Sequence, residues 1–337
     1  MLAFLLIFLA ALIVAMAATP VARRLALVSG MVAFPNARRA HQTPTPLLGG
    51  IAIYLGCAIA LILFSDRFYV SQLIGIFIGA TFVSFLGLWD DRRDLPPLAK
   101  LAGQVFGALV LVWTGIRIEV FPSTAVDVGL TLVWIVGITN AMNLVDNMDG
   151  LLGGVATVAS AFFLVLAAQS GQFLVASLAA ALLGACLGFL YYNFNPASIF
   201  MGDSGSLFIG YVLAAVGIKL KFDNTDLVTW MIPVLILGLP IFDTTLVVIS
   251  RLRRHTNPLV GGKDHLSHRL VRLGWTHREA VMALYLVCGA LGVVSMMLVT
   301  ATMVEAYVVG GIIFAVALLA LIKLETLAEP RSETRTP

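Results

Sequence analysis

Eleven apolar stretches, each close to the length of a membrane-spanning helix, occupy almost the whole sequence. A spanning helix needs about 20 predominantly apolar residues, and polar joints containing Pro and Gly divide the chain into pieces of about that size. Only 12% of the residues are charged, against roughly 25% in soluble domains. We therefore predict an all-α polytopic membrane protein with about eleven transmembrane helices. They are expected at residues 2–19, 47–65, 71–89, 98–114, 128–143, 151–169, 174–192, 207–220, 228–246, 279–299 and 305–322.

Two of these stretches, 128–143 and 207–220, are short, which leaves open a broken helix, a tilted helix or helix ends within a polar cavity. If the helices alternate in direction, one side of the membrane carries all but four of the 21 Lys and Arg residues. Cytoplasmic loops are enriched in Lys and Arg, so we expect the N-terminus outside and the C-terminus in the cytoplasm. Residues 1–325 are expected to form a single membrane-embedded domain. Residues 326–337 are polar and are expected to form a disordered cytoplasmic tail.

Acidic residues gather at the ends of the apolar stretches on this cytoplasmic side. Asp90 and Asp91 are adjacent, and adjacent carboxylates repel unless a cation or a metal ion neutralises them. Asp146 and Asp149 are three residues apart and can share one face of a helix. A salt-bridged turn and a capped helix start are the simpler explanations for the two pairs. Polar groups at membrane depth are costly, and this favours one site assembled from several loops.

The segment from Asn193 to Ser206 combines carboxamides, Phe200, glycines and Asp203 ahead of an apolar stretch. Backbone amides at a Gly-rich helix start can hold phosphate, and Mg²⁺ prefers carboxylates together with phosphate oxygens. An ordinary helix-capping turn is the alternative for this segment.

Basic loops with histidines complete the cytoplasmic surface. The largest contains His265 and His268, three residues apart, followed by Arg269. No third zinc ligand is evident and the basic neighbours oppose a cation, so a pyrophosphate is the better ligand. Attraction to anionic lipid is the alternative. The first cytoplasmic loop adds Arg39 and His41.

The loops supply carboxylates for Mg²⁺ and cations for phosphate, and the bilayer holds one of the reactants. This combination predicts phosphoryl-group transfer from a soluble donor to a membrane lipid. The competing class is a transporter or lipid flippase. Transport would place essential charges near the middle of the membrane in discontinuous helices, and it often shows internal repeats. The acidic residues here lie at helix ends, which disfavours transport.

These motifs, in this order, resemble the polyprenyl-phosphate N-acetylhexosamine-1-phosphate transferases, a family related to the phospho-MurNAc-pentapeptide translocase. The resemblance rests on Arg39-Ala-His41 with Pro46-Leu-Leu-Gly49-Gly50, Asp90-Asp91, Gly137-Ile-Thr-Asn140-Ala-Met-Asn143-Leu-Val-Asp146, Asp149-Gly150, Asn193 with Phe200-Met-Gly-Asp203, Pro240-Ile-Phe-Asp243-Thr, and Asp264-His265-Leu-Ser-His268-Arg269-Leu. It covers nearly the full length of the chain.

The resemblance implies Mg²⁺-dependent transfer of a sugar 1-phosphate from a UDP-sugar to undecaprenyl phosphate, with release of UMP. Mn²⁺ is an alternative metal. The implied location is the bacterial plasma membrane, with the active site on the cytoplasmic face. The implied partners are a UDP-N-acetylhexosamine, a polyprenyl phosphate and membrane lipids, with no nucleic acid and with a homodimer left open. The product would start a lipid-linked cell-envelope glycan such as teichoic acid or O-antigen.

The resemblance also implies residue roles. The metal ligands would be Asp203 and Asp90. Catalytic roles are implied for Asp90, Asp91, Lys100, His265 and His268. Substrate binding is implied for Asn143, Asp146, Asp149, Asn193, Phe200, Arg39, His41 and Arg269, with Phe200 stacking on uracil.

Two features depart from the family pattern. Asn147 replaces the first Gly of the usual Asp-Gly-Leu-Asp-Gly. If that Gly has a positive φ, Asn is a common substitute, so we expect the turn to survive. The three adjacent histidines of the translocase are absent, and His265-Leu-Ser-His268 takes their place. This favours UDP-GlcNAc as the donor, with UDP-MurNAc-pentapeptide or another UDP-N-acetylhexosamine as the alternative.

Overall fold

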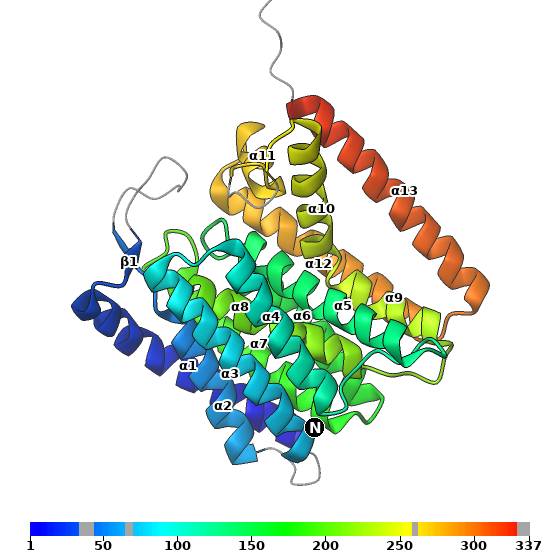
Figure 1. The fold of residues 1–337 in the computed structure, drawn as a ribbon, viewed down its shortest axis with the longest axis horizontal. Helices are drawn as coiled ribbons and strands as arrows, with labels where there is room; N and C mark the ends of the chain where they lie inside the picture. The colour runs from blue at the N-terminus through cyan, green and yellow to red at the C-terminus, as the bar shows by residue number, and fades with distance from the viewer. Residues whose placement is uncertain (34–43, 65–69, 258–261, 329–337) are drawn as a thin grey trace, which may run out of the picture.

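The structure of the protein, a computed structural model, describes residues 1–33, 44–64, 70–257 and 262–328. Apart from one short antiparallel strand pair, its regular elements are α-helices (Figure 1). The elements are α1 (Leu2–Ser29), β1 (Val32–Ala33), β2 (Thr45–Pro46), α2 (Gly49–Phe64), α3 (Val70–Arg93), α4 (Pro97–Trp113), α5 (Thr124–Val145), α6 (Leu151–Gln169), α7 (Phe173–Asn193), α8 (Gly202–Lys219), α9 (Asp226–Ile236), α10 (Gly238–Arg253), α11 (Leu266–Arg272), α12 (His277–Leu298) and α13 (Met303–Ala328).

Helix α8 is the buried centre of the bundle. Every residue from Ser204 to Ile218 is buried, and α3, α5 and α2 pack around it. A helix without a polar face is stable when other helices surround it. The start of α8, which carries Asp203, is therefore held by its neighbours.

Small residues bring α1 close to α7. A Cβ added at Gly184 would lie 2.2 Å from the carbonyl oxygen of Phe8, and one at Gly188 would lie 2.6 Å from that of Leu12. Helices in lipid associate mainly through van der Waals packing, so interfaces with small residues four apart allow the closest approach. The long first helix is thereby fixed against the core.

Each of the eleven predicted stretches falls on a helix or, for 228–246, on the bent pair α9 and α10. Within the described chain, seven helices are long and apolar enough to cross a membrane, and the bent pair makes eight if counted as one span. Helices α2 and α4 are shorter. The prediction of an all-α multi-pass membrane protein is confirmed, whereas the number of eleven crossings is not confirmed by helix length.

The two short stretches, for which we considered a break, form the continuous helices α5 and α8. The break lies instead at Leu237, where α9 and α10 meet at 75°. Pro240 has no N–H to donate to the carbonyl of Ile236, so the helix cannot run straight through this point.

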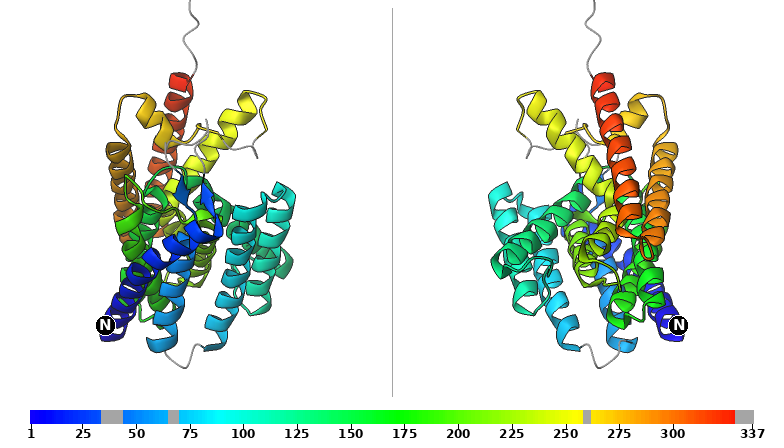
Figure 2. Two further views of the ribbon diagram at one scale, coloured as in Figure 1. Left: turned by 90° about the vertical axis from the view of Figure 1, so that its left-hand side faces the viewer. Right: turned by 90° about the vertical axis from the view of Figure 1, so that its right-hand side faces the viewer.

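The N-terminus and the end of α13 lie at opposite ends of the bundle (Figure 1). Figure 2 shows that the upper part of α10, α11 and the last turns of α13 project beyond the other helices. Helix α13 continues to Ala328, three residues into the predicted tail. Residues 329–337, the rest of that tail, lie outside the described residues.

Candidate active site

The end of α3 and the start of α4 bring Asp90 and Lys100 together beside Asp203 of α8. Lys100 Nζ contacts the carboxylate of Asp90 and lies 3.4 Å from Oδ2 of Asp203. The carboxyl groups of Asp90 and Asp203 are themselves neighbours. Asp90 Oδ1 also accepts the backbone N–H of Leu95 at 2.7 Å, so the turn between α3 and α4 holds it in place. Three predicted site residues from three helices thus form one cluster.

Asp91, although adjacent to Asp90, faces the start of α8. Its carboxylate accepts the backbone N–H groups of Asp203 at 2.9 Å and Ser204 at 3.2 Å. The first N–H groups of a helix need such acceptors, and here another helix supplies them. A Cβ at Gly202 would lie 2.5 Å from Oδ2 of Asp91, and Gly202 has a φ of +69°. Asp91 therefore positions the residue that we predicted to bind the metal.

Asn143, near the end of α5, closes the other side of the cluster. Its Nδ2 donates to Oδ1 of Asp203 at 3.0 Å and to Oγ of Ser206 at 2.8 Å. We did not identify Ser206 from the sequence. Its position three residues after Asp203 could have signalled it, because residues with that spacing share a helix face.

Asp146 follows α5 in the loop that leads to α6. Burial, together with the negative charges of Asp203 and Asp149, raises the pKa of its carboxyl to about 7. Within the described residues, Lys100 is the only cation that forms an ion pair with this group of carboxylates. The site therefore has an excess of negative charge when its carboxyls are ionised.

The donor set fits Mg²⁺ bound jointly with a phosphate. Asp90 and Asp203 offer neighbouring carboxylates, and Mg²⁺ is usually held by one or two carboxylates plus substrate phosphates and water. No group of three or more His, Cys, Asp or Glu side chains in the described ranges forms a complete metal site by itself. Phosphate oxygens would therefore have to complete the coordination.

Asp149 and Asn193 join the loop after α5 to the loop between α7 and α8. Asp149 Oδ2 accepts the backbone N–H of Ala197 at 3.0 Å. Asn193 accepts the N–H of Gly150 at 3.1 Å and donates to the carbonyl of Ile199 at 3.0 Å. The structure thus uses these two predicted substrate-binding side chains to shape the loops around the site.

Asn147 does not occupy the left-handed position of its turn. That position belongs to Gly150, with a φ of +77°, and Asn147 is not among the described residues with positive φ. The turn is present, but our reason for expecting it was wrong. Asn147 donates to the carbonyl of Leu144 at 2.8 Å and accepts a hydrogen bond from Oγ of Ser267. A glycine could not make this link to α11.

Asp243 of α10 orients His265 at the start of α11. Nδ1 of His265 lies 2.7 Å from one carboxylate oxygen, and the backbone N–H of Leu266 donates to the other at 2.7 Å. Both side chains are buried. A histidine held through Nδ1 keeps Nε2 for another partner. The sequence motif included Asp243, but we assigned it no role.

His268 lies beside His265, with the ring centroids 6.4 Å apart. Burial, together with the charges of His265 and Lys263, lowers the pKa of His268 to about 4. Its imidazole is therefore neutral at pH 7 and can act as a hydrogen-bond donor or acceptor.

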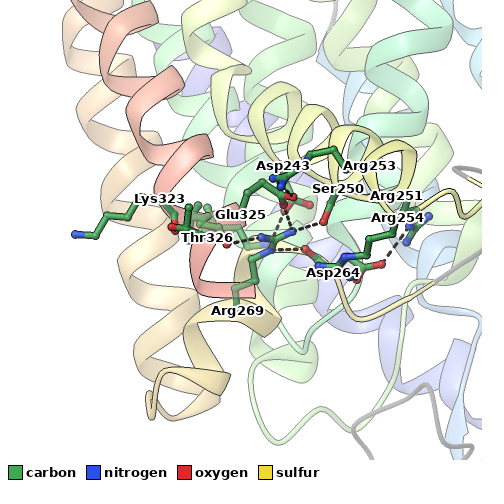
Figure 3. Close-up of polar contacts among 12 residues, drawn as sticks. Asp243, Ser250, Arg251, Arg253, Arg254, Asp264, Arg269, Lys323, Glu325 and Thr326 are labelled. Atoms are coloured by element: carbon green, nitrogen blue, oxygen red, sulfur yellow. Dashed lines mark hydrogen bonds and ion pairs between the residues drawn. The ribbon is translucent and has the colours of Figure 1, made fainter. Parts of the chain in front are cut away.

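Arg269, which we predicted to bind substrate, makes its contacts within the protein. The side chain is 4% exposed, and its guanidinium donates to Ser250, Glu325 and backbone carbonyls (Figure 3). These contacts join α11 to α10 and α13. The structure thus gives Arg269 a role in the scaffold, through four hydrogen bonds within the protein, and its binding of substrate stays a prediction.

Phe200 is fixed through its backbone. Its N–H donates to the carbonyl of Pro46 at 2.8 Å, and its carbonyl accepts the N–H of Gly49 at 2.9 Å. The side chain is half-buried, and its stacking on uracil stays a prediction. Arg39 and His41 lie outside the described residues.

Comparison with known proteins places this site in a family. Residues 73–221 match the model of Glycosyl transferase family 4. A Bacillus subtilis protein named probable undecaprenyl-phosphate N-acetylglucosaminyl 1-phosphate transferase is 35% identical over 304 residues, covering 88% of this chain and 85% of the relative. The chain belongs to glycosyl transferase family 4. The expected relationship to the polyprenyl-phosphate N-acetylhexosamine-1-phosphate transferases is thereby confirmed.

This family-4 transferase has further similar relatives. A Mycolicibacterium smegmatis decaprenyl-phosphate N-acetylglucosaminephosphotransferase is 36% identical over 321 residues, covering 84% of this chain and 79% of the relative. A Bacillus anthracis phospho-N-acetylmuramoyl-pentapeptide-transferase is 32% identical over 273 residues, covering 73% and 82%. The segment that matches the family model contains the cluster around Asp203 and ends before α10 and α11.

Proposed function

We propose that this family-4 transferase moves N-acetylglucosamine 1-phosphate from UDP-GlcNAc to a polyprenyl phosphate and releases UMP. The observation that carries the proposal is the cluster of Asp90, Lys100 and Asp203 at one end of a membrane bundle. The names of the relatives, which specify N-acetylglucosamine phosphotransfer to undecaprenyl or decaprenyl phosphate, support the reaction type.

In the net reaction, a phosphate oxygen of the lipid bonds to the sugar-bearing phosphorus of the donor. The bond from that phosphorus to the oxygen that bridges to UMP breaks, and its electron pair leaves with UMP. Both reactants are anionic, so the site must supply positive charge. Lys100 supplies one such charge between Asp90 and Asp203.

Mg²⁺ is the proposed cofactor, with Mn²⁺ as a substitute, and Asp203 and Asp90 are its proposed ligands. When bound, the ion would neutralise charge on the phosphates. The carboxylates of Asp203 and Asp149 near Asp146 support this assignment, because their negative charges add to the effect of burial in raising the pKa of Asp146.

The remaining side chains surround the donor in this proposal. Asn143 and Asp146 face the nucleotide, and Phe200 stacks on uracil. His265, held by Asp243, and neutral His268 meet the phosphates or the sugar. Arg39 and His41 are proposed to bind phosphate on the basis of the sequence.

We favour N-acetylglucosamine over the muramoyl pentapeptide as the transferred group. The relatives named for N-acetylglucosamine are 35% and 36% identical over 88% and 84% of this chain, whereas the muramoyl-pentapeptide relative is 32% identical over 73%. The segment His265-Leu-Ser-His268 also lacks three adjacent histidines.

The proposed location is the bacterial plasma membrane, with the site on the cytoplasmic face and the N-terminus outside. Supporting this orientation, all but four of the 21 Lys and Arg residues fall on the side of the site when the predicted helices alternate. Soluble UDP-sugars are cytoplasmic, so this orientation lets the donor reach the site.

Transfer by purified protein in detergent tests the proposal. Radiolabelled UDP-GlcNAc and undecaprenyl phosphate would be incubated with Mg²⁺, with Mn²⁺ and with EDTA, and UDP-MurNAc-pentapeptide and UDP-GalNAc would compete as donors. We expect a metal-dependent radiolabelled lipid and an equal amount of UMP. If the protein preferred UDP-MurNAc-pentapeptide, that donor would take the place of UDP-GlcNAc in the proposal. If folded protein formed no lipid product, the proposed reaction would be refuted.

A further inference from the structure

Glu325, in the last turns of α13, is the buried partner of Arg269 (Figure 3). Its Oε1 accepts from Nη2 of Arg269 at 2.8 Å, and the two side chains are 5% and 4% exposed. The most apolar part of α13 is different, because none of the residues in that 18-residue window is buried. A buried ion pair at the tip of an otherwise peripheral helix calls for an explanation beyond helix packing.

The guanidinium of Arg269 forms hydrogen bonds to residues of several structural elements. Nε donates to the carbonyl of Asp264 at 2.8 Å, and Nη1 donates to the carbonyl of Leu324 at 2.8 Å. Nη2 donates to Oγ of Ser250 at 2.8 Å in addition to Glu325. The planar donors of an arginine suit such a junction, which here connects α10, α11 and α13.

Helix α11 depends on these anchors for its orientation. It has only seven residues, and so short a helix has little stability of its own. Asp243 holds its start through His265, whereas Arg269 holds its second half. His268 immediately precedes Arg269, so the second anchor sets the position of that imidazole.

We propose that Glu325 is a positioning residue for the transfer reaction. Through Arg269 it holds α11 so that His265 and His268 stay at the site, and the last helix of the chain thereby takes part in building the active site. This inference rests on the proposed function. Removing the charge of Glu325 leaves a buried guanidinium without its counter-ion, and α11 then shifts to expose it.

The kinetic test compares Glu325→Gln with Glu325→Asp in purified protein. Misplacement of a reacting group by about 1 Å costs on the order of 10²-fold in rate, so we expect Glu325→Gln to lower kcat/KM about tenfold to a hundredfold. Glu325→Asp keeps the charge and should recover part of the loss. Thermal unfolding in detergent would verify that both variants are folded.

Two matched controls isolate the contact with Arg269. Arg253→Gln removes the exposed partner of the same carboxylate, which lies 3.2 Å from Oε2 and is 53% exposed. Glu305→Gln changes the exposed glutamate at the other end of α13, which bonds to Thr302. Both are expected to keep wild-type kcat/KM.

A double-mutant cycle distinguishes positioning from general destabilisation. If Glu325 acts through the histidines of α11, Glu325→Gln should cause little further loss in a His268→Ala background, because coupled residues are not additive. An equal fold-loss in both backgrounds would overturn the proposal. So would a folded Glu325→Gln enzyme with unchanged kcat/KM.

Limited proteolysis tests the same idea without activity. Lys263, shortly before α11, and Arg272, its last residue, are exposed. Both are trypsin sites that should be cut faster in Glu325→Gln than in wild type or Arg253→Gln. Unchanged cleavage would show that Glu325 does not hold α11. If wild-type protein transfers nothing, the proposed function fails and the kinetic role of Glu325 fails with it, but the cleavage result still decides whether Glu325 holds α11.

Discussion

At the residue scale, neighbouring carboxylates in this site have different tasks. Asp90 contacts Lys100, whereas Asp91 accepts two backbone N–H groups at the start of α8. Asp203 lies between Lys100 and Asn143. The directions in which these side chains point therefore distinguish the carboxylates that we propose to take part in the reaction from Asp91, which supports the start of α8.

Replacing Asp203 with Asn should abolish most of the activity without unfolding the protein. Loss of one preorganised charge at a reacting group costs on the order of 10²- to 10³-fold in kcat, and we expect Asp203→Asn to lower transfer by that amount. The backbone N–H that Asp91 accepts is unchanged, so Tm should stay near wild type. Asp223→Asn, at an exposed position before α9, is the control. Near-normal turnover would contradict the role of Asp203.

The raised pKa of Asp146 predicts a pH-dependent stability. In the folded protein the carboxyl keeps its proton up to about pH 7, against an ordinary value of 3.8. The folded state thus binds more protons between these values, and this contribution to stability is lost as pH rises through that window. In EDTA, Asp146→Asn should have a higher Tm than wild type at pH 8, and this Tm difference should be smaller at pH 5, where only part of the window has been crossed. The same Tm difference at both pH values would rule out this titration.

At the element scale, close helix contacts decide where the carboxylates point. A Cβ at Gly87 of α3 would lie 2.4 Å from the carbonyl oxygen of Asp203. Only a glycine lets α3 come near enough for Asp91 to cap α8. Gly188 likewise allows α7 to pack closely against α1.

Filling the contact at Gly188 should destabilise the bundle. The Cβ of Gly188→Ala would lie 2.6 Å from the carbonyl oxygen of Leu12, so α1 must move away from α7 and lose packing. We expect a lower Tm in detergent. Gly289→Ala in α12 is the matched control, since a Cβ there meets nothing within 4 Å and Ala favours helix by about 1 kcal/mol over Gly. Equal Tm values for the two variants would contradict this account.

At the scale of the whole molecule, alternating helices return their polar ends to one end of the bundle. The ends of α3, α5 and α7 and the starts of α4, α6 and α8 supply the site (Figure 1). Helices α10, α11 and α13 add the histidines and their supports at the same end (Figure 2). A soluble donor and a membrane lipid can meet only at such an end.

Cysteine labelling tests which side of the membrane this end faces. The native residues Cys57, Cys186 and Cys288 are buried, so background labelling should be low. With the proposed orientation, Ser123→Cys, at the exposed start of α5, should react with an impermeant maleimide in intact cells. Arg93→Cys, at the exposed end of α3, should react only after permeabilisation. The reverse pattern would invert the topology.

Hydropathy located the helices well because a membrane helix must be apolar for about 20 residues. Hydropathy alone missed the bend at Leu237, since 228–246 reads as one apolar stretch, although Pro240 within it was a sequence signal for a helix break. Site residues were identified from their position at helix ends. The roles of Arg269 and Asn147 were missed, because their partners Glu325 and Ser267 lie far from them in the sequence.

By itself, the sequence determined that this protein is a multi-pass helical membrane protein and which polar residues reach one end of it. These properties depend on local composition and on the alternation of helices. Only the tertiary structure decided that Asp91 supports Asp203, that Asp243 orients His265 and that Glu325 holds Arg269. Such pairings depend on distances of a few ångströms between segments that are distant in sequence, and those distances exist only once the helices are packed.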